Sequence, residues 1–150
     1  MERRCGPSGA HVTTLADLLA SGRLQSVPAD SAAAHLRLSR SEQHLRTAAR
    51  LLGQDNEVAY GSLYDAARKA VTAHMLARGL RASGTAGAHA AVGIYAIERV
   101  PDPTGSVHEF QRMRRRRNKS EYDDMVFGSQ EVAVDLKHAE NIVAAVRACI

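Results

Sequence analysis

The residues best suited to chemistry lie in one stretch, RMRRRRNKSEYDD, which runs from Arg112 to Asp124. Six of its first eight residues are Arg or Lys, and three acidic residues then surround Tyr122. Guanidinium groups bind phosphate through paired hydrogen bonds, and they stabilise negative charge that develops in a transition state. The stretch therefore has three interpretations: a solvated helix face, a nucleic-acid surface, or the wall of an active site.

The charge of the whole chain points to the same stretch. The 150 residues include 20 basic and 16 acidic ones, for a formal net charge of +4. Residues 112–119 hold six basic and no acidic residues, so the remainder has 14 basic and 16 acidic residues, or −2. A partner attracted by charge would therefore be attracted to this octet.

Helical geometry divides the basic residues among different faces, because each residue is rotated by about 100° from the one before it. Arg117 and Glu121 are four residues apart and are expected to form an ion pair. The other residues make two stripes, one of Arg112, Arg115 or Arg116, and Lys119, and one of Arg114, Asn118 and Tyr122. The apolar pattern stops after Met113, and a helix that is polar all round projects into solvent, lines a wet cleft or forms an interface.

The rest of the chain predicts an all-α fold. Aromatic residues make up 4% of the sequence and Trp is absent, a composition that favours helices over sheets. Residues 1–12 are expected to be disordered, and residues 13–150 are expected to form one domain, an antiparallel bundle of four to five helices with a short N-terminal helix. No strand pattern of any length and no internal repeat is visible.

Capping residues and breakers give the expected boundaries of these helices. Thr14 and Asp55 or Asn56 are N-cap candidates, and Pro28 suits the first turn of another helix. Ser106 with Glu109 has the spacing of a capping box at the start of the basic helix, and Ser129 opens the last helix. His89 is interpreted as a helix-start or packing residue, His74 as a hydrogen-bonded core residue, and Tyr60 and Tyr64 as core residues.

Other classes of protein are not indicated. The longest uncharged run, residues 82–97, is shorter than the roughly 20 residues of a membrane span, and the N-terminus has no secretory pattern, so we expect a cytoplasmic protein with no membrane partner. Cys5 and Cys149 are interpreted as reduced thiols. No metal site and no cofactor are expected, because zinc patterns and Gly-rich phosphate loops are absent from the sequence.

One segment, AYGSLYDAARKAVTAHMLARGLRASGTAGAHAAVGIYAI, is similar to the second and third helices of the HEPN superfamily (higher eukaryotes and prokaryotes nucleotide-binding domain). The matching features are Tyr64, the small residues at 66, 67 and 70, a Gly at 79, and His89. RNKSEYDD resembles the HEPN signature, an Arg followed by a polar residue and, four to six residues later, a His. The resemblance covers about residues 29–148.

Arg117 matches the signature arginine and Asn118 its polar follower, but Tyr122 stands where the His would be. Subgroups that resemble nucleotidyltransferase substrate-binding domains carry an acidic residue and a Tyr here, and residues 121–123 fit that version. Tyr is a poor general base at pH 7, because its ordinary pKa is about 10. His108 and His138 lie outside the spacing of the signature.

The resemblance implies a homodimer in which two signature helices face each other across a positive cleft for RNA or a nucleotide. In many relatives that cleft is a metal-independent endoribonuclease, commonly the toxin of a toxin–antitoxin pair. The implied catalytic residues are Arg117, Asn118 and Tyr122, and the implied nucleic-acid-binding residues are Arg112, Arg114, Arg115, Arg116 and Lys119. The alternatives are a non-catalytic module that docks a minimal nucleotidyltransferase or other partner, and a purely structural domain, so enzymatic activity stays open.

Overall fold

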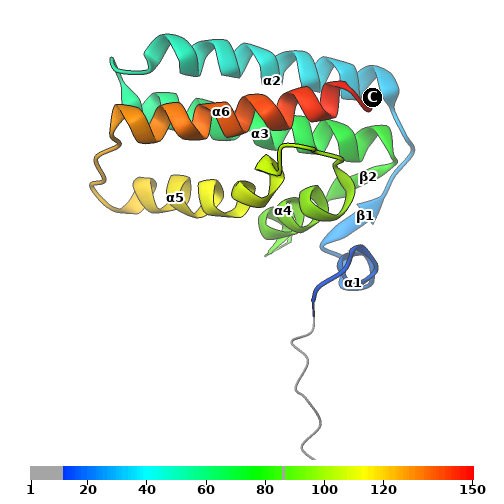
Figure 1. Cartoon of the computed structure of the whole chain (residues 1–150). Helices are drawn as coiled ribbons and strands as arrows, with labels where there is room; N and C mark the ends of the chain where they lie inside the picture. Colours follow the sequence, from blue (N-terminus) through cyan, green and yellow to red (C-terminus); the bar gives the residue numbers. More distant parts are fainter. Residues whose placement is uncertain (1–11, 86) are drawn as a thin grey trace, which may run out of the picture.

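The computed structural model describes residues 12–85 and 87–150. The expected disordered N-terminus therefore lies, apart from Val12, outside the described residues. Within them the chain forms α-helices joined by short connections, which confirms the all-α bundle (Figure 1). The elements are α1 (Leu15–Ala20), β1 (Leu24–Ser26), α2 (Ser31–Leu51), α3 (Asn56–Ala77), β2 (Leu80–Ala82), α4 (Ala88–Arg99), the 3-10 turn η1 (Ser106–Glu109), α5 (Phe110–Tyr122) and α6 (Ser129–Arg147).

Helix α3 is the centre of the bundle. It packs along α2 on one side and against α6 and α5 on others, and α4 and α5 lie across it from α2 (Figure 1). Five of its alanines are completely buried: Ala59, Ala66, Ala67, Ala70 and Ala73. These small side chains let the neighbouring helices approach closely, while Tyr60, Leu63 and Met75 fill the space between them.

The predicted N-caps of two helices are confirmed. Thr14 and Asp17 form a reciprocal capping box at the start of α1, and Asp55 accepts a hydrogen bond from the backbone N–H of Val58. Pro28 is not in the first turn of α2, contrary to expectation, because that helix begins at Ser31 and Asp30 caps it. Ser129 opens α6, as predicted.

A two-stranded antiparallel sheet is present that the sequence pattern does not predict. Strand β1 pairs with β2 so that Leu24 lies opposite Ala82 and Ser26 opposite Leu80. Gly79 makes the preceding turn with a φ of +75°, and a Cβ there would lie 2.7 Å from the carbonyl oxygen of Val27. Three-residue strands carry no readable alternation, so only the approach of two distant segments reveals this pair.

The expected capping box at Ser106 is wrong. Residues 106–109 form the 3-10 turn η1, and α5 begins only at Phe110. The hydroxyl of Ser106 lies instead 3.0 Å from Nδ1 of His138 and accepts a hydrogen bond from the side chain of Asn141. The Ser106 hydroxyl therefore bonds with side chains of α6 and does not cap the start of α5.

An ion pair between Arg112 and the buried carboxylate of Asp135 joins α5 to α6. Arg112 donates to both carboxylate oxygens of Asp135, at 3.0 and 2.6 Å, and the hydroxyl of Tyr60 donates to the same carboxylate at 2.8 Å. Asp135 is 1% exposed. Burial raises the pKa of Asp135, but the hydrogen bonds from Arg112 and Tyr60 outweigh burial and hold that pKa below its ordinary value.

The predicted core role of His74 is confirmed. Its ring is buried between helices, with Nδ1 2.8 Å from the hydroxyl of Tyr95. Its Nε2 atom has no hydrogen-bond partner among the described residues. Burial lowers the pKa of His74 to about 4 and raises that of Tyr95 to about 12, so the imidazole is neutral in the fold at neutral pH.

Replacing the buried carboxylate should destabilise the fold. Asp135→Ala leaves the guanidinium of Arg112 and the hydroxyl of Tyr60 without their shared acceptor, and we expect the free energy of unfolding in urea to fall by about 3 kcal/mol. The control is Glu109→Ala, because Glu109 binds the same Arg112 from a more exposed position, at 2.7 Å. That variant should lose less than about 1 kcal/mol. Equal losses in both variants would contradict the role given to Asp135.

The neutral His74 should make the fold sensitive to mild acid. The unfolded chain binds a proton at this residue below pH 6.5, whereas the folded protein binds it only near pH 4. Stability should therefore decrease as the pH falls from 6.5 to about 4, by an amount on the order of 3 kcal/mol. We expect His74→Gln to remove this part of the pH dependence in urea unfolding, and the exposed control His35→Gln to keep it. Parallel curves for His74→Gln and the unmodified chain would refute this prediction.

Candidate nucleic-acid interface

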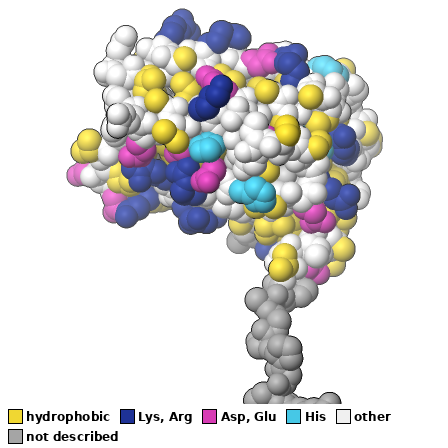
Figure 2. Space-filling model, in the orientation of Figure 1, with side chains coloured by type: hydrophobic (Ala, Val, Ile, Leu, Met, Phe, Trp, Pro, Cys, Tyr) yellow, Lys and Arg dark blue, Asp and Glu magenta, His cyan; other side chains and the backbone are white. Residues whose placement is uncertain are grey.

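Helix α5 carries the basic stretch, and two apolar residues anchor it. Phe110 and Met113 are completely buried, and the ring of Phe110 contacts that of Tyr64 on α3 at a centroid distance of 5.6 Å. Beyond Met113, residues 114–122 of the helix have no fully buried side chain. Lys and Arg side chains gather over α5, with a few acidic side chains among them (Figure 2).

One face of α5 binds α6 through its arginines. Arg112 binds Asp135 and Glu109, and these contacts raise the pKa of Arg112. Arg116, one turn later, forms an ion pair with Glu131, and its guanidinium lies 5.2 Å from the centre of the Phe127 ring. Two of the predicted nucleic-acid-binding residues therefore hold the bundle together.

A second face of α5 points to solvent. Arg115 and Lys119 are exposed, and no ion pair of either is found among the described residues. Tyr122, the last residue of the helix, is 87% exposed and does not line a pocket with Arg117. The predicted stripe of Arg114, Asn118 and Tyr122 is thus divided, and only its first two members share a pocket.

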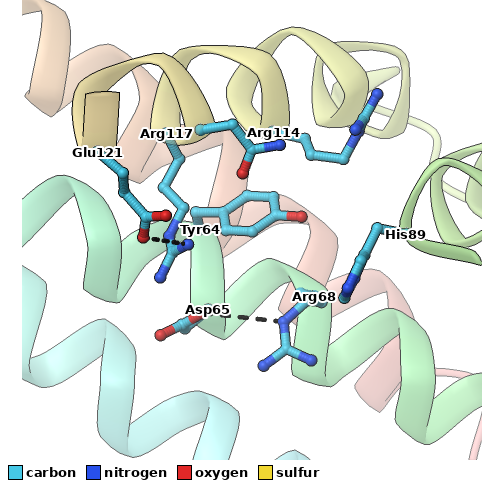
Figure 3. A pocket seen from close by; sticks show the side chains of 8 residues that line it. Tyr64, Asp65, Arg68, His89, Arg114, Arg117 and Glu121 are labelled. Atoms are coloured by element: carbon cyan, nitrogen blue, oxygen red, sulfur yellow. Dashed lines mark ion pairs between the residues drawn. The ribbon is translucent and has the colours of Figure 1, made fainter. Parts of the chain in front are cut away.

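The third face of α5 forms one wall of a pocket of about 370 Å³. This pocket, called here the α5 pocket, has α3 as its other main wall and α4 at one end (Figure 3). Its lining residues come from three helices: Tyr64, Asp65 and Arg68 from α3, His89 from α4, and Arg114, Arg117, Asn118 and Glu121 from α5. It brings together three of the predicted site residues, Arg114, Arg117 and Asn118.

Arg117 is held in the α5 pocket by two neighbours. Its Nη1 lies 2.7 Å from a carboxylate oxygen of Glu121, which confirms the predicted ion pair. Its guanidinium also lies 5.8 Å from the ring centre of Tyr64, a favourable arrangement for a cation and an aromatic ring. Burial raises the pKa of Tyr64, so Arg117 packs against a neutral phenol ring.

Arg114 is positioned by a link between α5 and α4. Its Nε donates at 2.9 Å to the amide oxygen of Gln111, and the amide nitrogen of Gln111 donates at 2.8 Å to the carbonyl of Ala90. Gly93 makes room for this amide, because a Cβ at position 93 would overlap the Gln111 side chain. The absence of a side chain on α4 thus allows Gln111 to hold both Arg114 and the neighbouring helix.

Arg68 and His89 complete the α5 pocket at the end away from Glu121 (Figure 3). Arg68 lies 3.8 Å from Asp65, a long and partly exposed ion pair. His89 is exposed and lines the pocket, a place that its interpretation as a helix-start or packing residue did not include. The feature that could have identified it is its position as the opening histidine of α4, which matched the resemblance.

The other two histidines considered for this site lie elsewhere. His138 is hydrogen-bonded to Ser106 between η1 and α6, and His108 is on the exposed side of η1. Neither lines the α5 pocket. Among the histidines that the structure describes, His89 is therefore the one that lines the α5 pocket with Arg117.

Metal and membrane sites are not found within residues 12–85 and 87–150. No group of three or more His, Cys, Asp or Glu side chains there could hold a metal ion. No helix in that part of the chain combines the length and the apolar character that a membrane span requires. Cys149 is a free thiol, while Cys5 lies outside the described residues.

Comparison with known proteins identifies the fold family. The family model described as the HEPN domain matches residues 34–149, close to the range over which the resemblance was seen. No match was found among curated proteins or among solved structures. Because the match spans most of the chain and includes both walls of the α5 pocket, this protein belongs to the HEPN family.

Proposed function

We propose that the α5 pocket binds the phosphate groups of RNA. The observation that carries this proposal is the convergence of Arg68, Arg114 and Arg117 on one pocket from two helices. Guanidinium groups offer several N–H donors in a plane and match the oxygens of a phosphate better than an ammonium does. Asn118 adds a neutral donor and acceptor at the same wall.

The acidic residues of the pocket fit this role. Glu121 and Asp65 form ion pairs with Arg117 and Arg68, but partly exposed pairs of this kind are worth only about 0–1 kcal/mol. A phosphate can therefore replace the carboxylate of Glu121 at little cost. Arg117 would then reach its ligand already oriented by the ring of Tyr64.

His89 favours a second, catalytic function for the same pocket, that of a metal-independent endoribonuclease. In such a reaction the RNA 2′-oxygen forms a bond to phosphorus, the bond from phosphorus to the 5′-oxygen breaks, and a cyclic phosphate and a 5′-hydroxyl result. A base must take the proton of the 2′-hydroxyl, and an acid must protonate the leaving oxygen. His89 is the candidate for proton transfer, and Arg117 and Arg114 for stabilising the charged phosphorane.

The proposal includes pairing of two copies through α5. Arg115, Lys119 and Tyr122 are exposed on the solvent face beside the pocket, where a second signature helix would meet them. The proposed function is that of the toxin in a toxin–antitoxin pair, with a minimal nucleotidyltransferase as the antitoxin.

Binding of RNA should respond in opposite directions to two substitutions. Arg117→Ala should weaken binding of a single-stranded oligoribonucleotide by about tenfold, because a charge-assisted hydrogen bond to phosphate is removed. Glu121→Gln should strengthen it, because a competing carboxylate is removed while the size of the side chain is kept. Fluorescence anisotropy at several salt concentrations measures both effects. Arg46→Ala, an exposed arginine of α2, is the control and should change little.

If Arg117→Ala and Arg46→Ala weaken binding equally, general charge rather than the α5 pocket explains the affinity. If the unmodified protein binds no RNA, the proposal fails.

Cleavage of RNA should depend on His89 but not on metal ions. With excess chelator we expect products that end in a cyclic phosphate and a 5′-hydroxyl. His89→Gln should lower the cleavage rate by about 10²–10⁴-fold while RNA binding is kept. His138→Gln is the control and should cleave normally, since His138 lies outside the pocket. Cleavage by His89→Gln at the unmodified rate would exclude the proton-transfer role, and binding without any cleavage would leave a non-catalytic RNA-binding or docking module.

A further inference from the structure

A second pocket, called here the α2 pocket, lies next to the first one. It has a volume of about 430 Å³ and is lined by residues of α2, α3 and β2. Of the seven described residues that line it, none is acidic and five are cations: Arg37, Arg40, Arg68, Lys69 and Arg81. The sequence does not reveal this cluster, because its members lie on three separate elements. In the sequence, the arginines of α2 look like ordinary residues of a solvent-exposed helix face.

The cations of the α2 pocket repel one another. Arg37 and Arg40 have no ion pair among the described residues, and Arg81 is held only by a hydrogen bond of 3.0 Å to the amide of Gln25. Burial lowers the pKa of Lys69, and Arg68, Arg37 and Arg40 lower it further, while Asp65 on the same helix opposes them. Arg40 and Arg81 are exposed, and the other three cations are partly buried. Grouping like charges destabilises a fold, and a bound anion reduces that cost.

The two pockets meet at Arg68, which lines both. The next residue of α3, Lys69, lines the α2 pocket and not the α5 pocket. The boundary between the two pockets therefore lies at Arg68. A ligand that extends beyond the α5 pocket past Arg68 therefore reaches a second pocket whose lining consists mainly of cations.

We infer that the α2 pocket binds further phosphates of the same RNA strand that occupies the α5 pocket, so that the ligand is a single-stranded RNA of several nucleotides and not one nucleotide. The inference rests on the proposed function. An acidic protein partner fits less well, because Ala82 is the single apolar residue among the described residues of the lining, whereas protein interfaces depend on buried apolar anchors. Repeated phosphates along a flexible strand need only a basic track.

The test uses the full chain and two oligomers, a twelve-nucleotide oligouridylate and a polyglutamate of equal charge. Arg37→Gln with Arg40→Gln should weaken binding of the oligouridylate by about tenfold or more. The slope of log K against log salt should fall by about 0.7 for each phosphate that the variant no longer neutralises. Lys69→Gln with Arg81→Gln repeats the test from other elements in case the first pair disturbs α2.

The matched control is Arg46→Gln with Arg50→Gln, which removes the same charge from the same helix outside the α2 pocket. Oligouridylate binding that falls with Arg117→Ala but is unchanged in both α2-pocket variants, or that falls equally in the control, would overturn the inference and leave the proposed function standing. Tighter binding of polyglutamate than of oligouridylate, abolished in the same variants, would assign the α2 pocket to an acidic protein and also overturn it. If the unmodified chain binds no oligouridylate, the proposed function fails, and this inference with it.

Discussion

The buried carboxylate of Asp135 fixes the rotation of α5 about its own axis. Arg112 binds it with two hydrogen bonds and Tyr60 with a third, so α5, α6 and α3 meet at one charged group that is almost completely inaccessible to water. A buried carboxylate without these partners would be strongly destabilising, and an arginine paired at both oxygens cannot turn freely. Once Arg112 is fixed in this way, the direction of every later side chain on α5 follows.

Helical geometry then separates structure from function within one basic run. Arg116 lies one turn beyond Arg112 and also faces α6, where Glu131 and Phe127 hold it. Arg114 and Arg117 point away from that side and form the wall of the α5 pocket. A continuous series of arginines thus supplies both the cations that hold the helix and the cations offered to a ligand, and sequence position alone does not tell them apart.

The pockets differ in how their charge is balanced. In the α5 pocket, Glu121 and Asp65 orient Arg117 and Arg68, and the ring of Tyr64 supports the first of these. Among the described residues the α2 pocket has no acidic lining residue, and Asp65 forms an ion pair with Arg68 alone of its five cations, so these cations repel one another. Arg68 belongs to both, and the two pockets together make a basic track over α3 with one ordered, partly neutralised end.

The sequence by itself determined the fold class and several interactions within one helical turn. The all-α bundle was predictable from the composition, which favours helices over sheets. The caps at Thr14 and Asp55 and the pair of Arg117 with Glu121 were predictable because the partners are three or four residues apart. The prediction that Tyr122 shares a face with Arg114 was wrong, because residues eight positions apart in a helix differ in direction by about 80°. Only the tertiary structure decided the strand pair, the partners of Ser106, the place of His89 and the α2 pocket, because each depends on elements far apart in the chain that meet only when the helices pack.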